Sequence, residues 1–139
     1  MSGKSVQTLM AKAERAVASA QALLDMGDAD GACNRAYYAM FDAAQAALLA
    51  AQVPVGEALG KTHRGLINTF STYLVKDGPV SKELGRQLKR AEEARLVADY
   101  DGPSIGLTDA AELVQQAHGF VLAMKNMFVP DIGDNSDSN

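Results

Sequence analysis

Apolar side chains recur along the first part of the chain at intervals of three and four residues. An α-helix turns once in about 3.6 residues, so this spacing places one apolar stripe along a helix. The stripe predicts a first helix that ends near Met26 and Gly27. Its members are Val6, Leu9, Met10, Ala13, Val17, Ala20 and Leu24.

A second helix is predicted to begin after Asp28 or Asp30 and to run to about Gln52. A short carboxylate side chain can accept hydrogen bonds from the unpaired amides of a helix's first turn. Pro54 should stop this helix, because proline disfavours helical geometry in the residue before it. A third helix is expected over residues 61–76.

A fourth helix is predicted over residues 82–99, with Ser81 as its cap, and a fifth opens at Thr108 with Asp109. No segment shows the alternation of apolar and polar residues that is typical of a strand. We therefore expect an all-α fold, an up-and-down bundle of about five helices over residues 1–129.

Composition narrows the class of protein further. A chain of 139 residues with 47% hydrophobic residues is long enough for one domain, which buries roughly 70% of the surface of its unfolded chain. The acidic tail over residues 130–139 has little to bury and is predicted to be disordered. With one cysteine, no long apolar run and no leader pattern, we expect a cytoplasmic protein without a membrane span.

The formal net charge of −4 provides no overall basic field. Such a field drives salt-dependent binding to duplex nucleic acid. Any contact with RNA would therefore have to come from a local cluster of arginines.

The stretch NRAYYAMFDAA places polar groups in the middle of the second helix. Arg35, Tyr38 and Asp42 share one side of that helix, and Asn34 adds an amide to the same stretch. At the end of the fourth helix, RLVADYD provides a second set of polar groups.

In this second set, Arg95 and Asp99 lie four residues apart and Tyr100 follows. The two sets have two interpretations. They could form a buried hydrogen-bond network that fixes the register of the helices. They could instead line a phosphate-binding cleft, since the planar fork of arginine suits phosphate and tyrosine offers a stacking face and a hydroxyl.

Three motifs, in order and spacing, resemble the HEPN superfamily: NRAYYAMF in the second helix, KTHRGLINTF in the third and RLVADY in the fourth. They resemble in particular the small bacterial and archaeal proteins often encoded beside a minimal nucleotidyltransferase. The resemblance covers about residues 5–128. It implies a helical bundle that forms a homodimer, and in many relatives a metal-independent endoribonuclease used as a toxin or in defence. The nucleotidyltransferase partner would be the antitoxin, which in some systems transfers adenylate onto the HEPN protein.

In the active relatives an arginine, matched here by Arg95, is followed four to six residues later by a histidine, where this chain has Asp99. RNA cleavage needs groups that accept and return protons near neutral pH. A carboxyl with an ordinary pKa of about 3.9, one turn from an arginine, would be a weak base and a poor acid. We therefore expect a module that binds RNA or a nucleotide, with little nuclease activity, and Tyr100 becomes a candidate for adenylation.

His63 in KTHRG lies in the first turn of the third helix, beside Lys61 and Arg64, and we count Arg64 among the RNA- or nucleotide-binding residues. His63 could simply form a helix-start hydrogen bond. If the third helix packs so that His63 faces Arg35 and Arg95, it could supply the missing acid or base. The chain would then be an endoribonuclease toxin that uses Arg95 with His63, or with an atypical Asp99, as its catalytic residues.

Two other residues are interpreted as structural. His118 lies next to the apolar stripe of the fifth helix and is expected to pack there, and Cys33 is expected to be a small buried residue. No set of ligands has the spacing of a metal site, so neither a metal nor a cofactor is predicted. A purely structural dimer with no ligand is the third alternative.

Overall fold

The computed structural model describes residues 5–54, 62–100 and 105–129, without the side chains of residues 98–100. The described residues form helices and no strand, which confirms the predicted all-α class. The elements are α1 (Val6–Asp25), α2 (Ala29–Ala50), α4 (His63–Phe70), the π-helical segment η1 (Ser71–Lys76), α5 (Lys82–Tyr100) and α6 (Leu107–Phe128). The predicted disordered tail lies outside the described residues.

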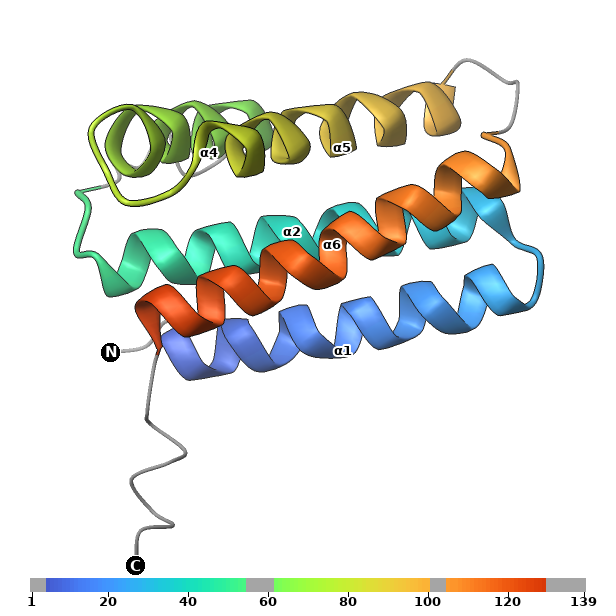
Figure 1. Ribbon diagram of the computed structural model, residues 1–139, viewed down its shortest axis with the longest axis horizontal. Coiled ribbons are helices and arrows are strands. Elements are labelled where there is room, and N and C mark those ends of the chain that lie inside the picture. Colours follow the sequence, from blue (N-terminus) through green and yellow to red (C-terminus); the bar gives the residue numbers. More distant parts are fainter. Residues whose placement is uncertain (1–4, 55–61, 101–104, 130–139) are drawn as a thin grey trace, which may run out of the picture.

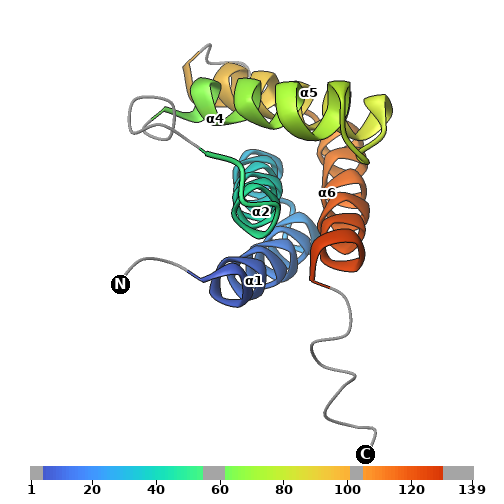
Figure 2. The same cartoon turned by 90° about the vertical axis from the view of Figure 1, so that its left-hand side faces the viewer.

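The helix α2 lies at the centre of the bundle. It contacts α1 and α6 on one side and α4 and α5 on another. Figures 1 and 2 show α4 and α5 forming a layer over α2, with α1 at the far side of the molecule. None of the described helices combines the length and the apolar character that crossing a membrane requires.

Local side-chain hydrogen bonds fix where most helices begin. The predicted caps are confirmed: Asp28 Oδ1 accepts from the amide of Gly31 at 2.8 Å, and Ser81 Oγ accepts from the amide of Leu84 at 3.1 Å. Thr62 Oγ1 caps α4 in the same way, accepting from the amide of Gly65 at 2.8 Å.

Two helix boundaries differ from the prediction. The third predicted helix is not uniform, because α4 ends at Phe70 and the chain continues as η1. The last helix begins at Leu107, with Gly106 as an N-cap that makes no side-chain hydrogen bond, and not at Thr108. The extended backbone of Gly106 already supplies the cap geometry, so the hydroxyl of Thr108 is not needed there.

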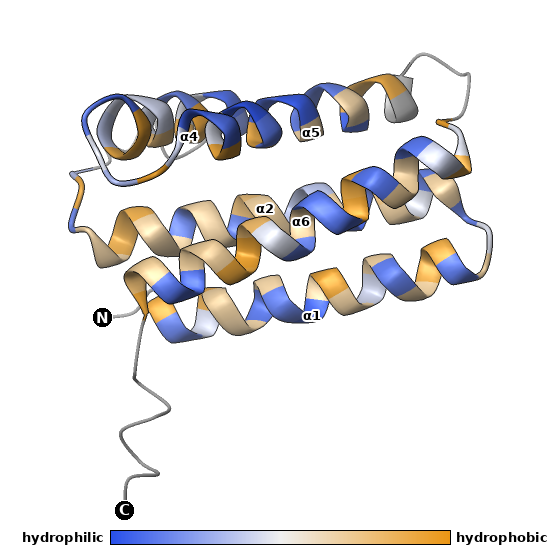
Figure 3. Cartoon of the chain, viewed as in Figure 1, coloured by the Kyte–Doolittle hydropathy of each residue, from blue (hydrophilic) through white to orange (hydrophobic). Residues whose placement is uncertain are grey.

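Alanine dominates the core around α1 and α2. Small side chains let these helices approach closely, and the larger buried groups Tyr37, Phe70 and Phe120 fill the remaining space. The fully or almost fully buried alanines of α1 and α2 are Ala13, Ala16, Ala20, Ala32, Ala36, Ala39, Ala43, Ala44, Ala46 and Ala47. Hydrophilic residues gather on α5, away from this core (Figure 3).

Candidate functional site

His63, the first residue of α4, lies against the aromatic side of α2. Its Nδ1 atom is 2.7 Å from the hydroxyl oxygen of Tyr37. Its ring stacks on Phe41 with centroids 4.4 Å apart and meets Tyr38 edge-on at 5.8 Å. The histidine is therefore held by three aromatic neighbours on one helix.

The sequence explains this local arrangement. Tyr37 and Phe41 are one helical turn apart, so both side chains point toward the same neighbour. Thr62 caps the first turn of α4 and so fixes the backbone of His63. Residues from two helices thereby define the position of one imidazole.

Arg95 of α5 completes the site from the other side. Its guanidinium carbon lies 5.0 Å from the centre of the Tyr37 ring and 5.9 Å from that of Tyr38. Both distances are within the range of cation–π attraction. Arg35, which is exposed, lies 6.0 Å from the Tyr38 ring. Two arginines therefore flank Tyr38.

A buried carboxylate accompanies these groups. Glu92 is only 8% exposed, and its charge acts on both Tyr37 and His63. It lies three residues before Arg95 and so on the same side of α5. We call the residues that gather here the His63 cluster: Tyr37, Tyr38, Phe41, His63, Glu92 and Arg95.

Burial and neighbouring charges set the protonation of the two groups that share the hydrogen bond. Burial lowers the pKa of His63 below its ordinary value, and Arg95 lowers it further, while Glu92 and Asp42 partly oppose this. Burial also raises the pKa of Tyr37 far above its ordinary value, with Glu92 adding to the effect and Arg95 opposing it. At pH 7 the imidazole and the phenol are therefore both neutral.

Comparison with known proteins agrees with this architecture. The HEPN domain family model matches residues 6–127. The chain belongs to the HEPN family. It is 36% identical to UPF0332 protein glr0978 of Gloeobacter violaceus, over 83% of this chain and 89% of the relative. It is 30% identical to "Putative toxin MJ0605" of Methanocaldococcus jannaschii, over 86% of each chain, and 27% identical to "Putative toxin MJ0142" of the same organism, over 91% of this chain and 83% of the relative.

The HEPN fold brings together several residues that the sequence singled out. His63, Tyr38 and Arg95 lie in the cluster, Arg35 lies at its edge, and the charge of Asp42 acts on His63. His63 shares a side-chain hydrogen bond with Tyr37 of α2, a contact that neither of its two interpretations named.

Other predicted residues lie apart or outside the described part of the chain. Arg64 is exposed and, among the described side chains, has no hydrogen bond or ring contact with the cluster. The amide oxygen of Asn34 is buried and accepts no hydrogen bond from the described residues. The side chains of Asp99 and Tyr100 lie outside the described residues.

Three cluster residues were missed, and one structural expectation was wrong. Tyr37, Phe41 and Glu92 were not proposed as site residues, although each lies three residues along its helix from one that was: Asn34, Tyr38 and Arg95 respectively. Cys33 is buried as expected, but His118 is exposed. His118 follows the buried Ala117 directly, so a rotation of about 100° carries it off the apolar stripe.

Proposed function

We propose that this HEPN chain is the toxin-like component of a nucleotidyltransferase/HEPN pair and that it binds RNA or a nucleotide at the His63 cluster. Relatives with the word toxin in their names support the first part. The observation that carries the second is the position of Arg95, 5.0 Å from the ring of a tyrosine that is hydrogen-bonded to His63.

The chemistry of the cluster suits a nucleotide. Arginine binds phosphate through its planar fork, and aromatic faces stack on unpaired bases. Arg35 and Arg95 could bind the phosphate. Tyr38 and Phe41 could stack on the base, since neither aromatic side chain is fully buried. The partner that we propose is a minimal nucleotidyltransferase antitoxin, with Tyr100 as its candidate target and a homodimer as the HEPN assembly.

The binding proposal is tested by the affinity of the purified protein for labelled single-stranded RNA and for ATP. We expect Arg95→Ala to weaken binding of at least one of them about tenfold, which corresponds to about 1.4 kcal/mol. Arg15→Ala is the matched control, because Arg15 is an exposed arginine of α1. Equal affinities for the native protein and both variants would overturn the proposal.

The geometry also favours a second function, metal-independent cleavage of RNA. The interaction of 2.7 Å between His63 and Tyr37 holds an imidazole beside the ring over which Arg95 lies, and this supports the endoribonuclease alternative. Because the pKa of His63 is lowered, the imidazole is neutral at pH 7. In the tautomer whose Nδ1–H donates to the hydroxyl oxygen of Tyr37, the Nε2 atom can accept the proton of a 2′-hydroxyl. Arg95 would stabilise the charge that develops on the phosphate.

Cleavage of labelled RNA in EDTA separates the two functions. We expect His63→Ala to reduce an existing activity about a hundredfold, the usual contribution of a general base, and Arg95→Ala to reduce it as well. Tyr37→Phe removes the hydroxyl that orients the imidazole and keeps the ring. If the native protein cleaves nothing but still binds RNA through Arg95, the HEPN chain is a binding module.

A further inference from the structure

A second polar surface lies on the same layer of helices as the His63 cluster. It is a groove of about 340 Å³ between η1 and the first half of α5. We call it the basic groove; its lining residues are Ser71, Thr72, Val75, Lys76, Lys82, Gly85, Arg86 and Lys89. Half of these side chains are cationic, and two carry hydroxyls.

The charge of the basic groove contrasts with that of the chain. The chain has 13 Lys and Arg against 17 Asp and Glu, yet none of the described lining residues is acidic. Arg86 is paired with the exposed Glu83 at 2.9 Å. Within the described residues, Lys76, Lys82 and Lys89 form no ion pair. Three lysines are therefore available to an anion at one place on an acidic protein.

Close packing of η1 on α5 forms the floor of the groove. A Cβ atom added to Gly85 would lie 3.1 Å from Cγ2 of Val75. Glycine in a helix interior is destabilising in itself, so its presence here is explained by this close approach. The η1 segment is π-helical, a geometry that often occurs at functional sites.

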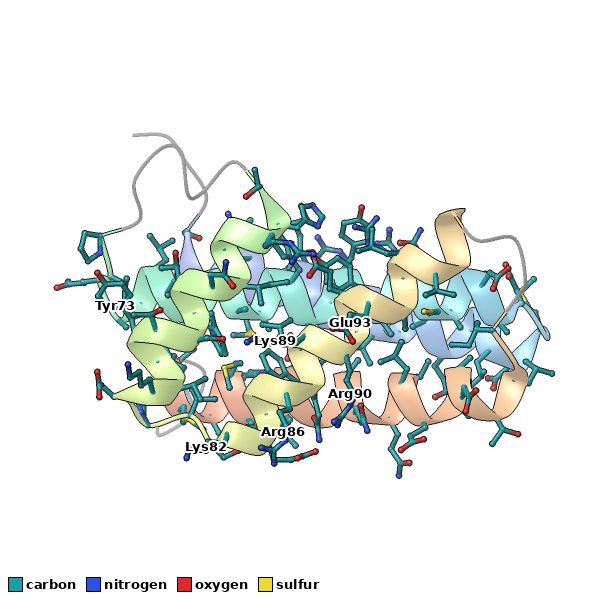
Figure 4. The ribbon with its side chains drawn as sticks, turned by 90° about the horizontal axis from the view of Figure 1, so that it is seen from above. Tyr73, Lys82, Arg86, Lys89, Arg90 and Glu93 are labelled. Atoms are coloured by element: carbon teal, nitrogen blue, oxygen red, sulfur yellow. The ribbon has the colours of Figure 1, made fainter. Side chains whose placement is uncertain are left out.

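The basic groove shares two helical segments with the His63 cluster, whose three aromatic side chains lie on α2. One segment begins with His63 and ends with Lys76, and the other begins with Lys82 and continues through Arg95. At 1.5 Å per residue, Lys89 lies about 9 Å and Lys82 about 20 Å from Arg95 along α5. Figure 4 shows the two segments diverging from the end near Lys82, with Lys89 between them.

We propose that the basic groove binds the phosphodiester backbone of a single-stranded RNA whose adjoining nucleotide occupies the His63 cluster. The proposal rests on the RNA-binding function proposed above and extends it by some 20 Å along α5. Lysines and hydroxyls are common ligands of nucleic-acid phosphates, and they track a strand without reading its sequence. A single strand is favoured because stacking on the aromatic residues of the cluster requires an unpaired base.

An acidic protein segment would suit the lysines alone. RNA suits the lysines as well, and the same strand could also reach the nucleotide site proposed at the His63 cluster, because His63 and Arg95 lie on the two segments that form the groove. This shared framework favours RNA.

The salt dependence of RNA binding tests the assignment. Fluorescence anisotropy gives the Kd of the full chain for a labelled RNA of about 12 nucleotides, a length within the range of single-strand binding sites, at several salt concentrations. Each phosphate contact of a single strand contributes about 0.7 to the slope of log Kd against log salt. We expect Lys82→Gln/Lys89→Gln to lower that slope by about 1.4 and to weaken binding at low salt.

The matched control is Lys12→Gln/Arg15→Gln, which removes the same charge from exposed positions on α1. It should leave the slope close to that of the native protein. Equal slopes for the two double variants, with binding that still depends on Arg95, would overturn the assignment of the basic groove as an RNA site. The proposed function would remain intact. No binding of RNA by the native protein would overturn both. Displacement of the RNA by polyglutamate at equal charge would reassign the groove to an acidic protein segment.

Discussion

The two sides of α2 differ in what they bury. On one side lie Ala39, Ala43 and Ala46, all without exposed surface, and the helix contacts α1 and α6. On the other side lies Tyr37, equally buried, but with a hydroxyl bonded to His63 and a guanidinium over its ring. Small apolar side chains stabilise the bundle without directional requirements, whereas the second side needs each partner in place.

The difference separates stability from function. The alanine side provides a rigid frame in which α2 cannot shift relative to α1. The aromatic side uses this frame to hold titratable groups away from water, where their pKa values depart from the ordinary ones. Substitutions in the two regions should therefore change different measured quantities.

The largest expected effect is on the apolar core. Phe120 is fully buried and its ring lies 5.8 Å from that of Phe70. We expect Phe120→Ala to lower the free energy of unfolding by about 3–5 kcal/mol, because it removes apolar contacts and leaves a cavity. Urea unfolding measures this change.

The remaining folded protein should keep its affinity for RNA, because Phe120 has no ring contact with the His63 cluster among the described residues. Phe41→Ala is the matched comparison, since Phe41 is partly buried and stacks on His63 at 4.4 Å. Phe41→Ala should lower the free energy of unfolding less than Phe120→Ala does, and it should weaken RNA binding more. Loss of RNA affinity in folded Phe120→Ala would contradict the separation of the two regions.

A smaller effect is expected at the helix caps. Thr62→Ala and Ser5→Ala each remove a hydroxyl that accepts from a backbone amide, at 2.8 and 3.0 Å respectively. Each should lower the free energy of unfolding by about 1 kcal/mol. Only Thr62→Ala should also weaken RNA binding, because Thr62 fixes the first turn of α4 and with it His63. Equal affinities of the two variants would show that the cap does not position the imidazole.

The elements of the fold could be predicted from local signals. Asp28 and Ser81 were identified as caps because a short polar side chain satisfies the free amides of its own helix. The change to a π-helix at Ser71 was not predicted, because an apolar stripe with helical spacing does not distinguish an α-helix from a π-helical continuation.

The site could be predicted only in part. Arg95, Tyr38 and His63 were named, but their meeting depends on how α4 packs across α2, and the hydrogen bond between Tyr37 and His63 joins residues 26 positions apart. Tyr37 was missed because helical spacing alone does not show that its hydroxyl has a partner. Glu92 was missed because a glutamate in a charged helix is ordinarily exposed.

The pH dependence of stability should also differ between the two regions. The folded protein lowers the pKa of His63, so between the folded value and about 6.5 the unfolded chain binds more protons. The contribution of His63 to stability is therefore complete above about pH 6.5 and is lost as the pH falls through the folded pKa.

Urea unfolding at pH 7 and pH 5 measures this contribution. The free energy of unfolding should fall more for the native protein than for His63→Gln. An identical fall in both proteins would mean that His63 is not held as a neutral group.

The ionisation of Tyr37 should change stability least of all, but it reports most directly on the environment of the site. Burial raises its pKa far above the ordinary value of about 10, so its phenolate should form last during an alkaline titration followed by phenolate absorbance. Tyr37→Phe should remove this late component and leave the earlier ones. Far-ultraviolet circular dichroism over the same pH range serves to check that the helices persist. A late component that survives in Tyr37→Phe would place the strongly buried phenol elsewhere and so break the contrast between the two sides of α2.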